Sequence, residues 1–120
     1  MKYSVSSIIN IDNSENELWH LITSPGHLNF VHPFCKSNKP INWGNDENKK
    51  DYLIYLNGLK YYRDFFKWEE KKGFELWIGK KNGKKSLVKW QIINNFDELK
   101  LKITVYPVSY THLTLPTMFE

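Results

Sequence analysis

Residues 51–68 read DYLIYLNGLKYYRDFFKW, and this stretch contains the pattern that decides the fold. Apolar and aromatic side chains are dense on both sides of Asn57-Gly58, and an Asn-Gly pair between two such runs is the strongest short signal for a β-hairpin. A type I′ turn needs a positive φ at both central residues, which asparagine and glycine tolerate best. The sequence therefore predicts two antiparallel strands, over 51–56 and 59–68.

Turn signals continue at regular spacing on both sides of this hairpin. Stretches rich in glycine, asparagine and charged residues separate further apolar runs, and they lie at 44–50, 69–73, 82–83 and 95–98. The apolar runs predict four more strands, at 35–43, 74–80, 85–95 and 99–106. Because the connections are short, strands that follow one another in the sequence should pair and form an antiparallel meander.

The region before this meander has a different pattern. Residues 3–11 alternate in polarity and predict a first strand. The S-x-x-E spacing that begins at Ser14 is typical of a capping box, and the apolar stripe after it predicts a helix over 14–23. Ser24-Pro25 starts a second short helix, which Pro33 must end. The predicted fold is α+β: one strand, two short helices and six further strands in one sheet.

Composition narrows the class of protein. The 120 residues are 41% hydrophobic and 25% charged, a balance that indicates one packed domain and argues against disorder or a membrane span. The first eleven residues contain no continuous apolar run of the kind a secretory signal needs. Cys35 is the one cysteine, so it has no partner for an internal disulfide. We expect a cytoplasmic protein.

The basic charge is weak support for a nucleic-acid partner. The net charge is +4, and all but one of the 17 basic residues are lysines, a bias typical of an AT-rich genome. Lysine pairs occur at several turns of the predicted meander, and because successive turns lie at alternate ends of the sheet, the pairs should be divided between its two ends. We predict no nucleic-acid partner. The lone arginine, Arg63, stands out because a lysine cannot present the same planar fork of donors.

Several short motifs, taken with the order of elements, carry a resemblance to a known superfamily. They are S-P-G-H-L at 24–28, H-P-F-C at 32–35, N-G-L at 57–59, and the tract 63–68 with Trp90. The sequence resembles a bacterial branch of the START-like, or helix-grip, superfamily, also called SRPBCC, which includes polyketide cyclases, plant pathogenesis-related proteins and lipid-transfer domains. The resemblance covers residues 1–107. It implies a curved antiparallel sheet of six or seven strands that closes a cavity against a long C-terminal helix.

The end of the sequence departs from this pattern. Residues 108–117, VSYTHLTLPT, contain no lysine, asparagine, aspartate or glutamate, although the preceding residues are rich in them. The run also matches the translation of a transposon-end adapter used in sequencing libraries, and a genuine eighth strand is the alternative. We interpret 1–107 as an incomplete START-like domain without its long helix, and 108–120 as a non-native read-through tail. A chain without that helix should be less stable than the intact protein.

The aromatic tract supplies the candidate site. Alternation places Tyr61, Arg63 and Phe65 on one face of their strand, and Tyr62, Phe66 and Trp68 on the other. Arg63 could hold a carboxylate or enolate oxygen with two donors, or could form a salt bridge with Asp51 or Glu75. The candidate ligand-binding residues are Arg63, Tyr61, Phe65, Trp90, His32, Phe34 and Tyr55.

Three functions remain open at this point. The first is binding of a small hydrophobic molecule between the curved sheet and the missing helix, as the resemblance implies. The second is a cyclase or dehydratase in which Arg63 polarises a carbonyl and His32, Tyr55 or Tyr61 moves a proton. The third is a protein-interaction domain that uses an outer surface, like the chaperone-activating members of the superfamily.

The sequence predicts no metal site and no cofactor. His27, His32 and Cys35 carry ligand atoms that bind zinc, but no second cluster completes a structural site. Cys35 and His32 as nucleophile and base would lack an orienting third group. Ordinary roles in turns and in the core are the simpler interpretation.

Overall fold

The computed structural model describes residues 4–44 and 49–107. The interpreted tail at 108–120 lies outside the described residues, so the read-through tail without the long helix, and its alternative of an eighth strand, remain predictions. The elements follow the predicted order: β1 (Val5–Ile11), α1 (Glu15–Thr23), α2 (Leu28–Val31), β2 (Cys35–Asn42), β3 (Lys50–Tyr55), β4 (Lys60–Glu69), β5 (Gly73–Gly79), β6 (Lys85–Asn95) and β7 (Glu98–Tyr106).

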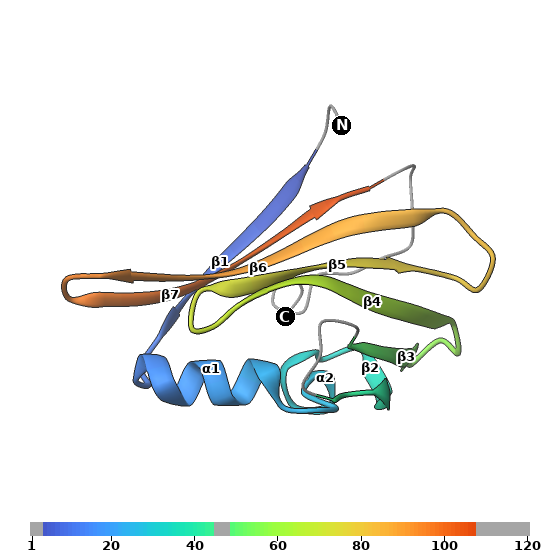
Figure 1. Ribbon diagram of the computed structural model, residues 1–120, viewed down its shortest axis with the longest axis horizontal. Helices are drawn as coiled ribbons and strands as arrows, with labels where there is room; N and C mark the ends of the chain where they lie inside the picture. Colours follow the sequence, from blue (N-terminus) through green and yellow to red (C-terminus); the bar gives the residue numbers. More distant parts are fainter. Residues whose placement is uncertain (1–3, 45–48, 108–120) are drawn as a thin grey trace.

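The seven strands form one antiparallel sheet in the order β1-β7-β6-β5-β4-β3-β2. From β2 to β7 each strand pairs with the next, and β1 pairs with β7 at the far edge. Figure 1 shows the sheet curling toward α1 and α2, which lie on one side of it. We call the side that faces the helices the concave face and the other side the convex face. The predicted meander is confirmed.

Helix α1 begins where its capping box was predicted. Ser14 Oγ accepts a hydrogen bond from the Glu17 N–H at 3.1 Å, and the Ser14 N–H donates to Glu17 Oε1 at 2.9 Å. These bonds satisfy donors that the first helical turn leaves without partners. Leu18 and Ile22 are buried and join the core beneath the concave face.

Helix α2 is shorter than predicted and starts later. Gly26 has a φ of +76°, a left-handed conformation that interrupts a helix, so α2 begins only at Leu28. The helix ends at Val31, and His32 is extended, as a residue before proline prefers. Both helices are far shorter than a segment that crosses a membrane, and no other helix occurs in the described residues.

The two Asn-Gly turns form hairpins, but neither is the predicted type I′ turn. At the first, the Gly58 N–H donates to the Tyr55 carbonyl at 2.9 Å, and Gly58 alone of the central pair has a positive φ, at +89°. At the second, Asn82 has the positive φ, at 62°, and Gly83 does not. The loops are longer than two residues, and longer hairpin loops need only one left-handed residue.

A register shift in β4 corrects the predicted position of Trp68. Pairing between β4 and β5 slips between Phe65 and Lys67, as it does at a β-bulge. The extra residue reverses the alternation, so Trp68 lies against Phe65 and Phe74 on the concave face. Sequence alternation had placed Trp68 on the same face as Phe66, and that expectation was wrong.

Candidate functional site

Four buried polar side chains meet beneath the concave face, and we call them the polar cluster. They come from separate segments: His27 from the turn before α2, Asn38 from β2, Asp51 from β3 and Arg63 from β4. Each is at most 3% exposed. Polar groups buried to this extent must find partners inside the protein, because each one left without a partner destabilises the fold.

Arg63 and Asp51 form a buried ion pair with two hydrogen bonds. The two residues are directly opposite in the pairing of β3 with β4, so their side chains share the concave face. Arg63 Nε donates to Asp51 Oδ1 at 2.8 Å, and Nη2 donates to Oδ2 at 2.6 Å. The predicted position of Arg63 beside Tyr61 and Phe65 is confirmed, and so is its alternative partner Asp51. Glu75 instead pairs with Lys67 at 3.5 Å.

Asn38 connects this ion pair to α2. Its Nδ2 donates to Asp51 Oδ2 at 3.0 Å and to the Tyr52 carbonyl at 2.8 Å. Its Oδ1 accepts a hydrogen bond, at 3.1 Å, from the N–H of Leu28, which is the first residue of α2. The carboxylate of Asp51 is therefore held from two directions, and its position relative to α2 is fixed.

His27 completes the polar cluster. Its Nε2 lies 2.8 Å from Arg63 Nη2. Burial is the main cause that lowers the pKa of His27 well below the ordinary value of 6.5, and the nearby Arg63 charge lowers it further. The imidazole is therefore neutral at pH 7.

Five aromatic side chains adjoin the polar cluster, and we call them the aromatic cluster: Trp43, Phe65, Trp68, Phe74 and Trp90. The Phe74 ring is stacked between Trp68 and Trp90, with centroid distances of 5.0 and 5.5 Å. Trp43 meets Phe65 edge to face at 5.2 Å. Trp43 and Trp68 are half-buried and the other three are buried. The cluster thus runs from the interior to the surface of the molecule beside the helices.

The two clusters are in direct contact. The His27 ring lies 5.1 Å from Trp90 and 6.2 Å from Phe74, measured between centroids. The Arg63 guanidinium carbon lies 4.8 Å from the centre of the Phe65 ring. Apolar surfaces with a few fixed polar groups at one end are typical of small-molecule sites.

The remaining predicted site residues form a second group near α2. His32 lies 5.5 Å from the Tyr55 ring and 6.2 Å from Phe34, and its Nδ1 accepts from the Phe34 N–H at 3.1 Å. Tyr55 lies 5.3 Å from Tyr61, and burial raises the pKa of Tyr61. Among the predicted site residues, Arg63 therefore belongs to the polar cluster and Phe65 and Trp90 belong to the aromatic cluster, while His32, Phe34, Tyr55 and Tyr61 form a separate group.

Sequence reasoning left out several members of the two clusters. The sequence indicates His27 only as part of the S-P-G-H-L motif and as a possible metal ligand, and Asp51 only as an ion-pair partner of Arg63. Asn38, Trp43 and Phe74 were not singled out at all. Alternation in β5 could have found Phe74, since Phe74, Leu76 and Ile78 share one face. No local signal indicates Asn38 or Trp43.

The described residues contain no group of three or more histidine, cysteine or acidic side chains placed to hold a metal ion. His27, His32 and Cys35 thus do not converge as zinc ligands would. Burial also raises the pKa of the Cys35 thiol, which disfavours the thiolate that a nucleophile requires.

Comparisons with known proteins identify the fold. No protein-family model and no curated protein matches the sequence. Among solved structures, CalU16 from Micromonospora echinospora matches with a TM-score of 0.65 and 16% identity, over 89% of this chain and 62% of that one. A START superfamily protein from Mycobacterium smegmatis matches with a TM-score of 0.68 and 13% identity, over 94% and 81% of the two chains. Ara h 8.0201 matches with a TM-score of 0.64 and 12% identity, over 96% and 83%.

These likenesses show a START-like fold, as the sequence motifs had implied. Identities this low carry the fold and not the chemistry. The chain spans less than two thirds of the length of CalU16.

Proposed function

We propose that this protein binds a small apolar molecule on the concave face of its START-like sheet. The observation that carries the proposal is the aromatic cluster, which reaches from half-buried Trp43 and Trp68 to buried Trp90 beside the polar cluster. Flat apolar surface supplies binding free energy, and a few fixed polar groups supply orientation. The same arrangement matches the function that the resemblance to the START-like superfamily implies.

The geometry of Arg63 favours binding over catalysis. A cyclase or dehydratase mechanism would use Arg63 to polarise a substrate carbonyl. Its Nε and Nη2 instead donate to Asp51 and His27 within the polar cluster. Arg63 then acts as a positioning group, which holds the neighbouring side chains in place.

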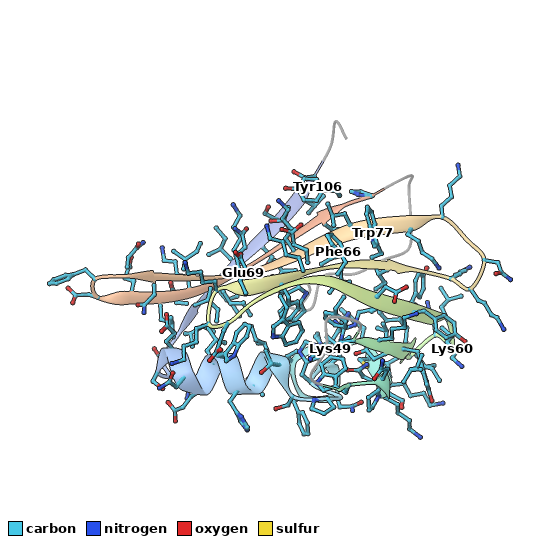
Figure 2. All side chains as sticks on the ribbon, in the orientation of Figure 1. Lys49, Lys60, Phe66, Glu69, Trp77 and Tyr106 are labelled. Carbon is cyan, nitrogen blue, oxygen red and sulfur yellow. The ribbon has the colours of Figure 1, made fainter. Side chains whose placement is uncertain are left out.

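The five tryptophans allow a direct test. Trp19, Trp43, Trp68 and Trp90 belong to the concave side, since Trp19 meets Trp68 at 5.8 Å. Trp77 lies on the convex face, where Figure 2 shows it beside Phe66 and away from the helices. The indole N–H signals in an NMR spectrum of the whole chain therefore report on both faces at once, with Trp77 as an internal control.

We expect 2-ethylnaphthalene, a small apolar probe, to shift the concave-side indole signals in a saturable way and to leave Trp77 unchanged. Native mass spectrometry of the protein purified from cells should also detect a co-purifying small molecule. Unshifted concave-side signals at saturating probe would refute the proposed function.

A second candidate function, protein interaction, rests on the convex face. Phe66 and Trp77 are 43% and 42% exposed, and their rings are stacked 5.4 Å apart. Aromatic side chains are enriched at protein interfaces, and exposed apolar side chains that lie together can mark such a site. The same titration separates the two functions, because a probe that shifts Trp77 alone would favour the convex face.

A further inference from the structure

The ring nitrogen of His27 that does not contact Arg63 is in an unusual environment. The imidazole is 0% exposed, and its Nδ1 has no hydrogen-bond partner among the described residues. Buried polar atoms without a partner are rare in native proteins, so each one has a structural or functional cause. The other polar cluster members donate to or accept from one another.

The Arg63 contact fixes what this nitrogen offers. A guanidinium group has donors and no acceptor, so His27 Nε2 must be the acceptor of the 2.8 Å contact. A neutral imidazole carries its one proton on the other nitrogen. His27 Nδ1 is therefore an N–H donor, and it is held beside the rings of Phe74 and Trp90.

The charge around this donor determines which acceptor suits it. Arg63 and Asp51 neutralise each other at 2.6 Å, with side chains 2% and 0% exposed. An anionic ligand would lose its hydration here, and no net positive charge would attract it in return. A neutral acceptor loses much less hydration.

We propose that the ligand of this site is an apolar molecule with a neutral carbonyl group, whose oxygen accepts a hydrogen bond from His27 Nδ1. The apolar part lies against Phe74 and Trp90. This inference rests on the proposed function, and it adds a ligand class and a recognition residue that the sequence did not indicate.

Two matched probes and one substitution test it. The probes are 2-ethylnaphthalene and 2-acetylnaphthalene, which share one ring system and differ in the carbonyl group. The substitution is His27→Gln, because a glutamine side-chain oxygen can replace Nε2 as the acceptor for Arg63, while the fixed Nδ1–H donor is replaced by an amide N–H in a different position on a flexible side chain. His20→Gln, at an exposed site on α1, is the control.

We expect His27→Gln to weaken binding of 2-acetylnaphthalene about fivefold, the effect of one lost hydrogen bond, and to change binding of 2-ethylnaphthalene less than about twofold. His20→Gln should change neither. Comparing the ratio of the two affinities cancels the different hydration of the probes. Equal losses for both probes would overturn the carbonyl assignment and leave apolar binding intact, whereas no binding of either probe to the native chain would overturn the proposed function itself.

A second measurement needs no substitution, so it applies even if His27→Gln fails to fold. In the native chain with ¹⁵N-labelled histidine, the protonated nitrogen of His27 should shift on addition of 2-acetylnaphthalene and much less on addition of 2-ethylnaphthalene. Equal shifts with the two probes would again overturn the carbonyl assignment.

Discussion

The β3–β4 hairpin carries two ion pairs in neighbouring positions of its register, one on each face. Asp51 pairs with Arg63 on the concave face, and the adjacent residues Lys50 and Asp64 pair on the convex face. The first pair is 2% and 0% exposed and has a 2.6 Å contact, whereas the second is 52% and 54% exposed with a 3.6 Å contact. The same chemistry thus occurs in two environments, and the environment determines its energetic consequence.

The faces differ in their aromatic residues as well. Phe65 and Phe66 are consecutive, yet Phe65 is 3% exposed in the aromatic cluster and Phe66 is 43% exposed on the convex face. Figure 2 shows Phe66 and Trp77 on the side of the sheet away from the helices. The concave face is therefore the packed face of the sheet, and four comparisons across the sheet can test it.

The largest effect should come from Arg63→Met. Removal of the arginine leaves the carboxylate of Asp51 buried without a counter-charge, which should lower the free energy of unfolding by about 3 to 5 kcal/mol. Urea denaturation measures this change. The double variant Arg63→Met/Asp51→Leu should recover much of the loss, because an apolar pair leaves no buried charge. A loss below about 1 kcal/mol in the single variant would show that the pair is not buried as described.

The next effect should distinguish the two phenylalanines. Phe65→Leu removes buried aromatic contacts and should lower the free energy of unfolding by about 1 to 3 kcal/mol, while Phe66→Leu should change it by about 0.5 kcal/mol or less. The two variants make the same chemical change one residue apart, so thermal or urea unfolding compares the faces directly. Equal losses would mean that Phe66 is covered in solution.

The third effect is a pH dependence that belongs to the concave face. The pKa of His27 is lowered in the folded state, so below about pH 6.5 the unfolded chain binds a proton that the folded chain does not. Stability should be unaffected by His27 above that pH and should fall by about 1.4 kcal/mol per pH unit below it, until the folded-state pKa is reached. This imidazole contacts Arg63, which is itself paired with Asp51, and the uncharged rings of Phe74 and Trp90.

Urea unfolding at pH 7.5 and pH 5.5 measures this dependence, with His27→Gln as the control. The variant should lose less stability than the native chain between the two pH values. Identical losses would show that His27 titrates normally and is not held neutral by burial.

The smallest effect should come from Lys50→Met on the convex face. An exposed ion pair contributes about 0 to 1 kcal/mol, and salt weakens it further. The loss of unfolding free energy, measured by urea denaturation at low and high salt, should therefore be several-fold smaller than the loss caused by Arg63→Met. A loss as large as that of Arg63→Met would remove the distinction between the faces.

Patterns within one element predicted much of the fold. The capping box at Ser14 fixed the start of α1, and alternation placed Arg63 and Phe65 on the same face. These features depend on residues a few positions apart, where helix and strand geometry relate sequence spacing directly to spatial position. Turn signals likewise predicted the six strands from β2 to β7 in meander order, and the two Asn-Gly pairs gave hairpins with a different turn type.

The tertiary structure decided which side chains meet in the candidate site. The contact between His27 and Arg63 joins residues 36 positions apart, and Asn38 meets Asp51 because β2 pairs with β3. The face of Trp68 depends on a register slip between β4 and β5, which neither strand shows by itself. Local spacing determines which way a side chain points along its own element. Which side chains then meet is set by the pairing, bulging and curvature of the whole sheet, since these bring distant segments together.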